Sequence, residues 1–276
     1  FGHKTNLKMV LLALFGATMG QGVVWYTGQF YAQSFIETVC KIDFEQSRTM
    51  LIWAILFATP FFVVFGSWSD KVGRKWIMMA GMFLAIIFYR PIYQQFLDLS
   101  DIATYQTQTP ASISEPVIHV DEVAEKTITT TSIVKTFTDG FAYTQKSRDT
   151  VFAGASKPVV NAAPVYTEKK LPTPFYWKFV FLIFVHVIFV TMVYGPIAAF
   201  LVEMFPTRIR YTSMSLPYHI GNGVFGGLTP FIALLLTTIN TGDKLVGLMY
   251  PIIISFICLI IGVVYISNKV DPDVSD

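Results

Sequence analysis

Six apolar stretches, each long enough to cross a lipid bilayer as a helix, dominate this sequence. A membrane-spanning helix needs about 20 consecutive, mostly apolar residues. Windows of this kind lie at Met9–Ile36, Met50–Trp68, Trp76–Phe96, Tyr176–Val202, Met214–Ile239 and Leu245–Ser267. Buried core helices are the alternative, but six of them in 276 residues would leave almost no amphipathic shell to face water. The pattern therefore predicts an all-α membrane protein with six transmembrane helices.

Charge is scarce in this sequence and unevenly placed. Only 14% of the residues are charged, against about 25% in a typical soluble domain. Of the 20 basic and 18 acidic residues, 16 fall between Leu97 and Pro172. A net charge of +2 without a dense basic stripe argues against nucleic acid as a partner. Cys40 and Cys258 lie far apart and give neither a disulfide framework nor a metal-ligand spacing.

This distribution divides the chain into three regions. Residues 1–96 hold the first three predicted helices, and residues 173–276 hold the last three and a short tail. Residues 97–172 are rich in Thr, Ser, Lys, Asp and Glu. A disordered loop and a small β-rich cap both fit that composition, and we expect partial strand content there. Because the chain begins at Phe1 rather than Met, we also expect a fragment of a longer protein.

The basic residues near the helix ends predict an orientation. On the side that carries both termini there are eight: Lys4, Lys8, Lys71, Arg74, Lys75, Arg208, Arg210 and Lys269. The opposite short loops carry three: Lys41, Arg48 and Lys244. Because short cytoplasmic loops are enriched in Lys and Arg, both termini are predicted to be cytoplasmic and the long loop 97–172 extracytoplasmic.

A charged turn separates the second and third predicted helices. It reads Gly66-Ser-Trp-Ser-Asp70-Lys-Val-Gly73-Arg74-Lys75. Gly73 can take a backbone conformation that side chains forbid, and Gly66 would let a neighbouring helix approach. Asp70 can pair with a basic residue, while Arg74 and Lys75 can reach carboxylates or helix C-terminal carbonyls. The turn is either a conformational latch or a solvated basic loop that fixes topology.

This spacing resembles the signature loop of the major facilitator superfamily. In that family the motif lies between helices two and three, and in degenerate form between helices eight and nine. The resemblance implies a half of the twelve-helix fold of that superfamily. It also implies that Asp70 and Arg74 belong to a cytoplasmic charge network that stabilises the outward-facing state.

A second segment narrows the resemblance. The run from Tyr194 to Ser213, which contains Glu203, Pro206, Arg208 and Arg210, and the run Ser215–Pro230 resemble metabolite:proton symporters of the superfamily. Pro206 ends the helix, and Glu203 would pair with Arg208, Arg210 or Arg74. The resemblance places the six spans at helices seven to twelve, the carboxyl-terminal half, and implies organic solutes as substrates. The sequence departs from the family in its long loop and in lacking helices one to six.

Polar and aromatic residues inside the spans are candidates for the substrate pathway. In the first span Gln21, Trp25 and Gln29 follow one helical stripe with Tyr26 beside it. Gln offers hydrogen bonds, and the Trp ring can face a cation. An interhelical hydrogen-bond seam is the alternative role for this stripe. Gln29 and Tyr31, nearer the outer surface, are weaker candidates.

Later spans add four candidates. His186 and Tyr194 are eight residues apart and so share one face of the fourth span. A buried His can relay protons or serve only as a satisfied hydrogen-bonding residue. Tyr218 and Asn222 are one turn apart in the fifth span, where His219 points elsewhere. Arg90 is expected to be an interfacial anchor.

No nucleophile motif, phosphate loop or paired buried acid indicates an enzyme, and no cofactor is expected. The function predicted for the full-length protein is symport of a small organic acid or zwitterion with protons, in the inner (plasma) membrane. The alternative is a six-helix channel or a non-transport scaffold. The expected partners are the substrate, protons, the bilayer and the missing amino-terminal half, which would carry the proton-coupling group.

Overall fold

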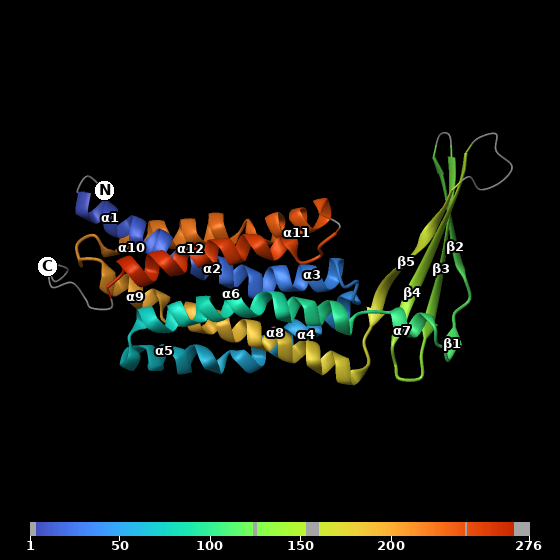
Figure 1. The fold of residues 1–276 in the computed structure, drawn as a ribbon, viewed down its shortest axis with the longest axis horizontal. Helices are drawn as coiled ribbons and strands as arrows, with labels where there is room; N and C mark the ends of the chain where they lie inside the picture. The colour runs from blue at the N-terminus through green and yellow to red at the C-terminus, as the bar shows by residue number, and fades with distance from the viewer. Residues whose placement is uncertain (1–3, 124–125, 153–159, 241, 268–276) are drawn as a thin grey trace. The chain divides into compact units, whose positions relative to one another are not determined.

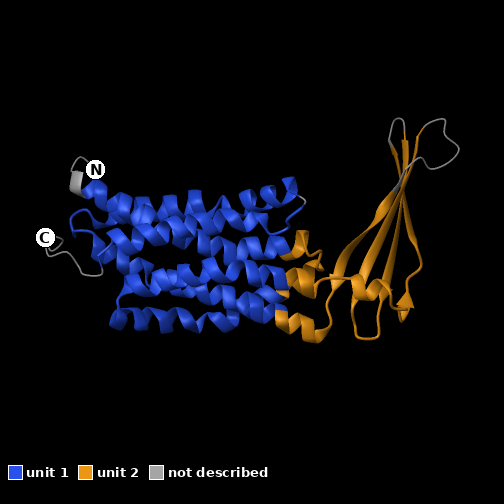
Figure 2. Ribbon diagram, in the orientation of Figure 1, with its two compact units in different colours: residues 1–35, 50–95, 179–276 blue, residues 36–49, 96–178 orange. Residues whose placement is uncertain are grey.

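The computed structural model describes residues 4–123, 126–152, 160–240 and 242–267. Lys269, counted above for the orientation, lies outside these residues. The chain divides into two compact units (Figure 2). The helical unit consists of Phe1–Phe35, Met50–Gln95 and Phe179–Asp276, and the sheet unit of Ile36–Thr49 and Phe96–Lys178. The sheet unit thus contains the strands together with four helix ends.

Six helices within the described residues are long and apolar enough to cross a membrane, which agrees with the six predicted spans. They extend beyond the predicted windows at most of their ends because polar residues continue the helices. Their bounds are Asn6–Thr38, Phe44–Val72, Arg74–Gln106, Thr173–Met204, Arg210–Ile239 and Val246–Tyr265.

Most of these spans are built from several helical segments (Figure 1). The first joins α1 (Lys4–Ala13), η1 (Leu14–Thr18), α2 (Met19–Tyr26), η2 (Thr27–Tyr31) and α3 (Ala32–Thr38). The next two are α4 (Phe44–Ala58) with α5 (Pro60–Val72), and α6 (Arg74–Leu99), which is followed by the short α7 (Ala103–Gln106). The last three are α8 (Thr173–Tyr194) with α9 (Ile197–Met204); α10 (Arg210–Ile220), η3 (Gly221–Gly226) and α11 (Thr229–Ile239); and η4 (Val246–Leu248) with α12 (Met249–Tyr265).

Three of the segments, η1, η2 and η3, are π-helical turns. A π turn inserts an extra residue into a helix and is frequent at functional sites. Two of them belong to the first span and one to the fifth. They therefore mark the two spans in which the glycine-rich contacts described below occur.

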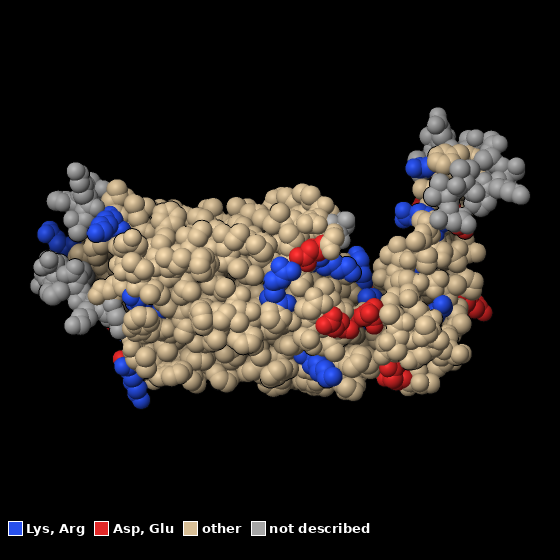
Figure 3. Space-filling view, viewed as in Figure 1, with Lys and Arg blue, Asp and Glu red and all other residues tan. Residues whose placement is uncertain are grey.

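The outer surface of the helical unit is apolar. Val63 is 75% exposed, Ile52 63% and Leu56 57%, while small residues such as Ala13, Ala17 and Ala54 are fully buried. On the face shown in Figure 3, charged side chains of this unit gather towards the helix ends. A bundle that exposes many large apolar side chains and buries small residues at close helix contacts suits a lipid solvent.

The segment between α7 and α8 forms a five-stranded antiparallel sheet, so the strand content expected in residues 97–172 is present beside the predicted all-α membrane part. The strands are β1 (Ser112–Ile113), β2 (Val117–Val123), β3 (Lys126–Thr136), β4 (Ala142–Phe152) and β5 (Val160–Lys170). Their order is β1-β3-β4-β5, and β2 also pairs with β3. Thr and β-branched residues fill β3, which explains its strand conformation.

A small aromatic cluster forms the core of the sheet unit. Phe141 is fully buried, and the Tyr105 ring of α7 stacks on it with centroids 3.9 Å apart. Phe137 and Tyr143 pack against each other beside it, and burial raises the pKa of the Tyr143 hydroxyl. Gly140 has a φ of +90°, which allows the tight turn between β3 and β4.

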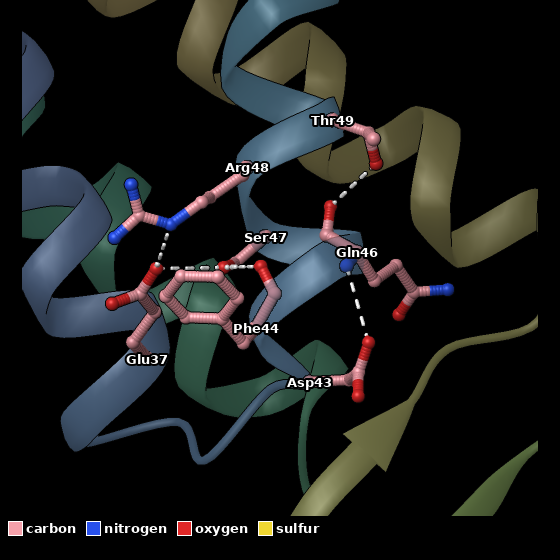
Figure 4. A network of polar contacts seen from close by, with 7 residues as sticks. All are labelled: Glu37, Asp43, Phe44, Gln46, Ser47, Arg48 and Thr49. Carbon is pink, nitrogen blue, oxygen red and sulfur yellow. Dashed lines mark hydrogen bonds and ion pairs between the residues drawn. The ribbon is translucent and has the colours of Figure 1, made fainter.

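The end of β5 is tied to the loop between the first two spans, within the sheet unit. The Asp43 N–H donates to the Lys169 carbonyl at 2.8 Å, and Gln46 exchanges two hydrogen bonds with the Leu171 backbone. In the same loop Ser47 donates to Glu37 at 3.0 Å, and the Arg48 side chain lies 3.5 Å from that carboxylate (Figure 4). These bonds hold the base of the sheet to the start of α4.

Candidate functional site

Gln21 and Asn222, predicted from different spans, form a reciprocal amide pair. The Gln21 Nε2 donates to the Asn222 Oδ1 at 3.1 Å, and the Asn222 Nδ2 donates to the Gln21 Oε1 at 3.1 Å. Asn222 also donates to the Tyr218 carbonyl at 3.0 Å. Gln21 is fully buried, whereas Asn222 is half-buried. Gln21 therefore fixes the orientation of the Asn222 side chain.

Three aromatic residues continue this cluster onto the fourth span. The Trp25 and Tyr194 rings have centroids 4.3 Å apart. The Tyr194 and Tyr218 hydroxyls are hydrogen-bonded to each other at 2.6 Å. All three side chains are half-buried. The structure thus brings together five of the predicted residues, which we call the polar-aromatic cluster: Gln21, Trp25, Tyr194, Tyr218 and Asn222.

Next to the cluster, the backbones of the first and fifth spans are in close contact at Gly22 and Gly221, which we call the glycine seam. A Cβ on Gly22 would meet the Gly221 carbonyl oxygen, and a Cβ on Gly221 would lie 2.6 Å from the Thr18 backbone. The Thr18 hydroxyl donates to the Pro217 carbonyl at 2.7 Å. Pro217 has no backbone N–H to donate, but it can take part in this bond because its carbonyl is the acceptor. Small residues allow the two backbones to touch and hold Gln21 within reach of Asn222.

The other pathway candidates have different neighbours. Tyr26 stacks on Phe30 with centroids 5.1 Å apart and lies against Gly226. His186 is fully buried, its Nδ1 lies 3.1 Å from the Leu182 carbonyl, and its ring stacks on Tyr89 at 5.5 Å. Although His186 and Tyr194 share a helix, one faces the rings of α6 and the other the polar-aromatic cluster. The expectation that they act on one face is not supported by these contacts.

Arg74 is the centre of the charged turn. Its Nη2 lies 2.9 Å from the carboxylate of Asp70, four residues earlier in α5, and its Nη1 lies 2.9 Å from Glu203 on α9. The Arg74 side chain is 21% exposed, Glu203 43% and Asp70 60%. Of the three arginines predicted as partners of Glu203, the one beside it is therefore Arg74. This side chain joins the second, third and fourth spans.

The glycines of the turn have unequal roles. Gly73 alone separates α5 from α6 and has a φ of +105°, as the sequence predicts. A neighbouring backbone does approach Gly66, whose nitrogen lies 3.5 Å from the Cβ position of Gly195, but a Cβ on Gly66 itself would meet nothing within 4 Å, so the approach does not depend on glycine at 66. The close approach instead needs Gly195, whose Cβ would lie 3.2 Å from the Phe62 carbonyl oxygen.

The remaining basic residues of this region bind backbone or face solvent. The buried Lys75 ammonium donates to the carbonyls of Val263 at 2.8 Å and Ile266 at 2.6 Å, at the end of α12. Arg210 donates to the Phe205 carbonyl at 3.0 Å, and Arg208 is exposed. Because the last carbonyls of a helix lack intrahelical donors, Lys75 caps α12 with a favourable charge.

Arg90 makes an ion pair that the sequence did not suggest. Its Nη2 lies 2.9 Å from Asp243, in the loop between the fifth and sixth spans. The Leu245 N–H and then Arg90 hold the pKa of the Asp243 carboxyl below its ordinary value. Asp243 is the single acid of residues 240–245, which is the signal that could have identified it as a partner.

The described residues contain no group of three or more His, Cys, Asp or Glu that could hold a metal ion. Cys40 and Cys258, both among the described residues, are buried and are not joined in a disulfide.

Two proteins of known sequence are similar to this chain. The inner membrane metabolite transport protein YhjE of Escherichia coli is 40% identical over 57 residues, 21% of this chain and 13% of its own length. A Haemophilus influenzae protein that carries the name of a metabolite transport protein is 32% identical over 108 residues, 39% of this chain and 23% of its own length. Over these segments the chain is similar to metabolite transport proteins. This confirms the resemblance predicted from the sequence.

The similarity covers less than a quarter of each of these metabolite transport proteins. No protein-family model and no solved structure matches the chain.

Proposed function

We propose that the chain is one six-helix half of a secondary transporter of the major facilitator superfamily, located in the inner membrane with both termini cytoplasmic. The full-length protein would move a small organic acid or zwitterion together with protons. The names of the relatives, the six apolar helices and the signature turn support this proposal. In it, residues 1–96 and 173–276 supply the spans, and residues 97–172 form an extracytoplasmic cap.

The polar-aromatic cluster carries the proposal. Two amides, two phenols and an indole ring from three spans meet at one place, and all but Gln21 are partly accessible. Amide N–H and phenol O–H groups can donate to a carboxylate, and the Trp25 ring can face an ammonium group. Gln21 would act as a positioning residue for Asn222. This chemistry suits an organic acid or zwitterion better than an inorganic ion.

The charged turn would act as the conformational latch. Arg74 joins Asp70 and Glu203 at the ends of three spans, where partly exposed ion pairs can break and reform. Alternating access would then consist of rocking of the two halves around the central site. The acids of this network lie at helix ends, so we assign proton coupling to the amino-terminal half.

The test is uptake by the full-length protein in membrane vesicles, with radiolabelled 2-oxoglutarate, citrate, proline, betaine and shikimate as probes. For the probe that is transported, Trp25→Ala and Tyr218→Phe should each raise the KM about tenfold, the cost of one lost contact of about 1.4 kcal/mol. Gln21→Ala should do the same through Asn222. Tyr211→Phe, at a residue 81% exposed on the same α10, is the matched control.

Counterflow and the dependence on a proton gradient separate the alternatives. A symporter shows both, a channel shows no counterflow, and a scaffold shows no uptake of any probe. Unchanged KM values in all three variants, with normal membrane insertion, would assign the cluster to helix packing instead.

A further inference from the structure

An apolar groove lies on the helical unit between the start of the first span and the end of the sixth. Its volume is about 530 Å³. Leu7, Leu11 and Phe15 line it at four-residue spacing, which places them on one face of the first span. Ile261 and Tyr265 line it from α12 with the same spacing. Two helix faces therefore form its walls.

A close helix contact forms one end of this groove. A Cβ on Gly262 would lie 2.5 Å from the Gly16 carbonyl oxygen, so the first and sixth spans touch backbone to backbone there. Beyond Gly16 towards the start of the first span, the lining side chains are large, and Leu7 and Leu11 remain 43% and 44% exposed. The groove thus lies beside the close contact of Gly16 with Gly262, where the side chains that line the two helices become large.

The groove has a basic rim. Among the described residues that line it, Lys8 is the one with a charge, and it is exposed. A Lys stem can lie along apolar surface while its ammonium reaches the polar interface. Tyr265, 66% exposed at the end of α12, has the amphipathic ring that membrane interfaces favour. An apolar trough with a cationic rim is complementary to an amphiphile with an anionic head.

We infer that this groove binds an anionic glycerophospholipid, with an acyl chain along Leu7, Leu11 and Phe15 and the phosphate at Lys8. Lipid tails are as apolar as Leu, so the walls alone cannot distinguish this lipid from its neighbours. Selectivity comes from the Lys8 charge. The inference rests on the membrane spans and is independent of transport.

The experiment uses the purified, delipidated full-length protein in detergent. Added phosphatidylglycerol should raise its unfolding temperature more than phosphatidylcholine does, and native mass spectrometry should show the anionic lipid retained. Lys8→Gln should weaken binding of phosphatidylglycerol about fivefold, as expected for one basic residue. Leu11→Trp, which fills the groove, should reduce retention of both lipids. Lys71→Gln, exposed in the charged turn, is the matched control and should leave both unchanged.

A second measurement keeps the test independent of variant folding. A photoactivatable phosphatidylglycerol should label the wild-type peptide that contains Leu7–Phe15. Labelling elsewhere only, equal retention of the two lipids by the wild type, or equal losses in the Lys8 and Lys71 variants would overturn the inference. Protection of this peptide by another segment of the full-length protein would show that protein, not lipid, fills the groove.

Discussion

The helical unit and the sheet unit differ in where they place apolar and aromatic side chains. In the helical unit many large apolar side chains face outwards, with Val63 75% and Leu56 57% exposed. In the sheet unit the aromatic residues Phe141 and Tyr143 are buried, and β2 carries exposed apolar residues such as Val117 together with polar ones. This difference is what we expect if, as proposed, the helical unit faces lipid and the sheet unit faces water.

Glycine also differs between the two units. Gly22 and Gly221 are needed for space, since a Cβ on either would meet backbone of the other span. Gly140 in the sheet unit has nothing within 4 Å of its Cβ position and is needed for its φ of +90°. The sheet unit thus requires Gly140 for a turn, whereas the helical unit requires glycine for packing and, at Gly73, also for a turn.

The largest expected effect tests the difference in solvent. Leu56→Arg places a charge near the centre of the second span and should cost insertion about 2.5–3.5 kcal/mol. Val117→Arg in β2, a position 67% exposed, should change stability by less than about 0.5 kcal/mol. The measurement is the amount of folded full-length protein in the membrane fraction. Equal losses of folded protein in the two variants would contradict the expectation that the second span and β2 face different solvents.

A smaller effect tests the glycine seam. Gly22→Ala forces a methyl group into the Gly221 carbonyl and should lower the free energy of unfolding by about 1–3 kcal/mol. Thermal unfolding of the purified full-length protein measures the change. Gly223→Ala is the matched control in η3, because a Cβ there meets nothing within 4 Å. If the two variants change the free energy of unfolding equally, the change is due to the helix propensity of Ala and not to a lack of space at Gly22.

The smallest effect compares ion pairs in the two units. Arg74→Gln leaves Asp70 and Glu203 without their common partner and should cost about 1–2 kcal/mol, reduced from the buried-pair value by the exposure of both acids. Lys146→Gln removes the 3.6 Å pair with Glu168 in the sheet unit and should cost about 0–1 kcal/mol. Chemical denaturation of both variants measures the two costs, and a larger loss from Lys146→Gln would contradict the ranking.

The spans and the charged turn were predictable because their signals are local. A window of about 20 apolar residues fixes a span wherever the rest of the chain lies. Likewise Gly73 was identified because the short turn between two predicted spans favours a residue whose backbone is not restricted by a side chain. The sheet was expected only in part, since Thr-rich composition favours strands without setting their pairing.

The candidate site was predictable in its members but not in its contacts. Helical spacing placed Gln21 with Trp25 and Tyr218 with Asn222, each pair on one face of its own helix. It could not show that Gln21 bonds Asn222, because that contact joins residues of different spans. It also assigned His186 to the same surface as Tyr194, although the His186 ring stacks on Tyr89 of α6.

The sequence by itself determined the solvent of the helices, the number of spans and the residues able to act in a pathway or latch. The tertiary structure alone decided which of these residues meet. Arg74 rather than Arg208 or Arg210 contacts Glu203, and Gly195 rather than Gly66 admits the neighbouring backbone. The physical reason is that hydropathy and helix periodicity act along the chain, whereas partner choice depends on the packing and rotation of helices distant in sequence.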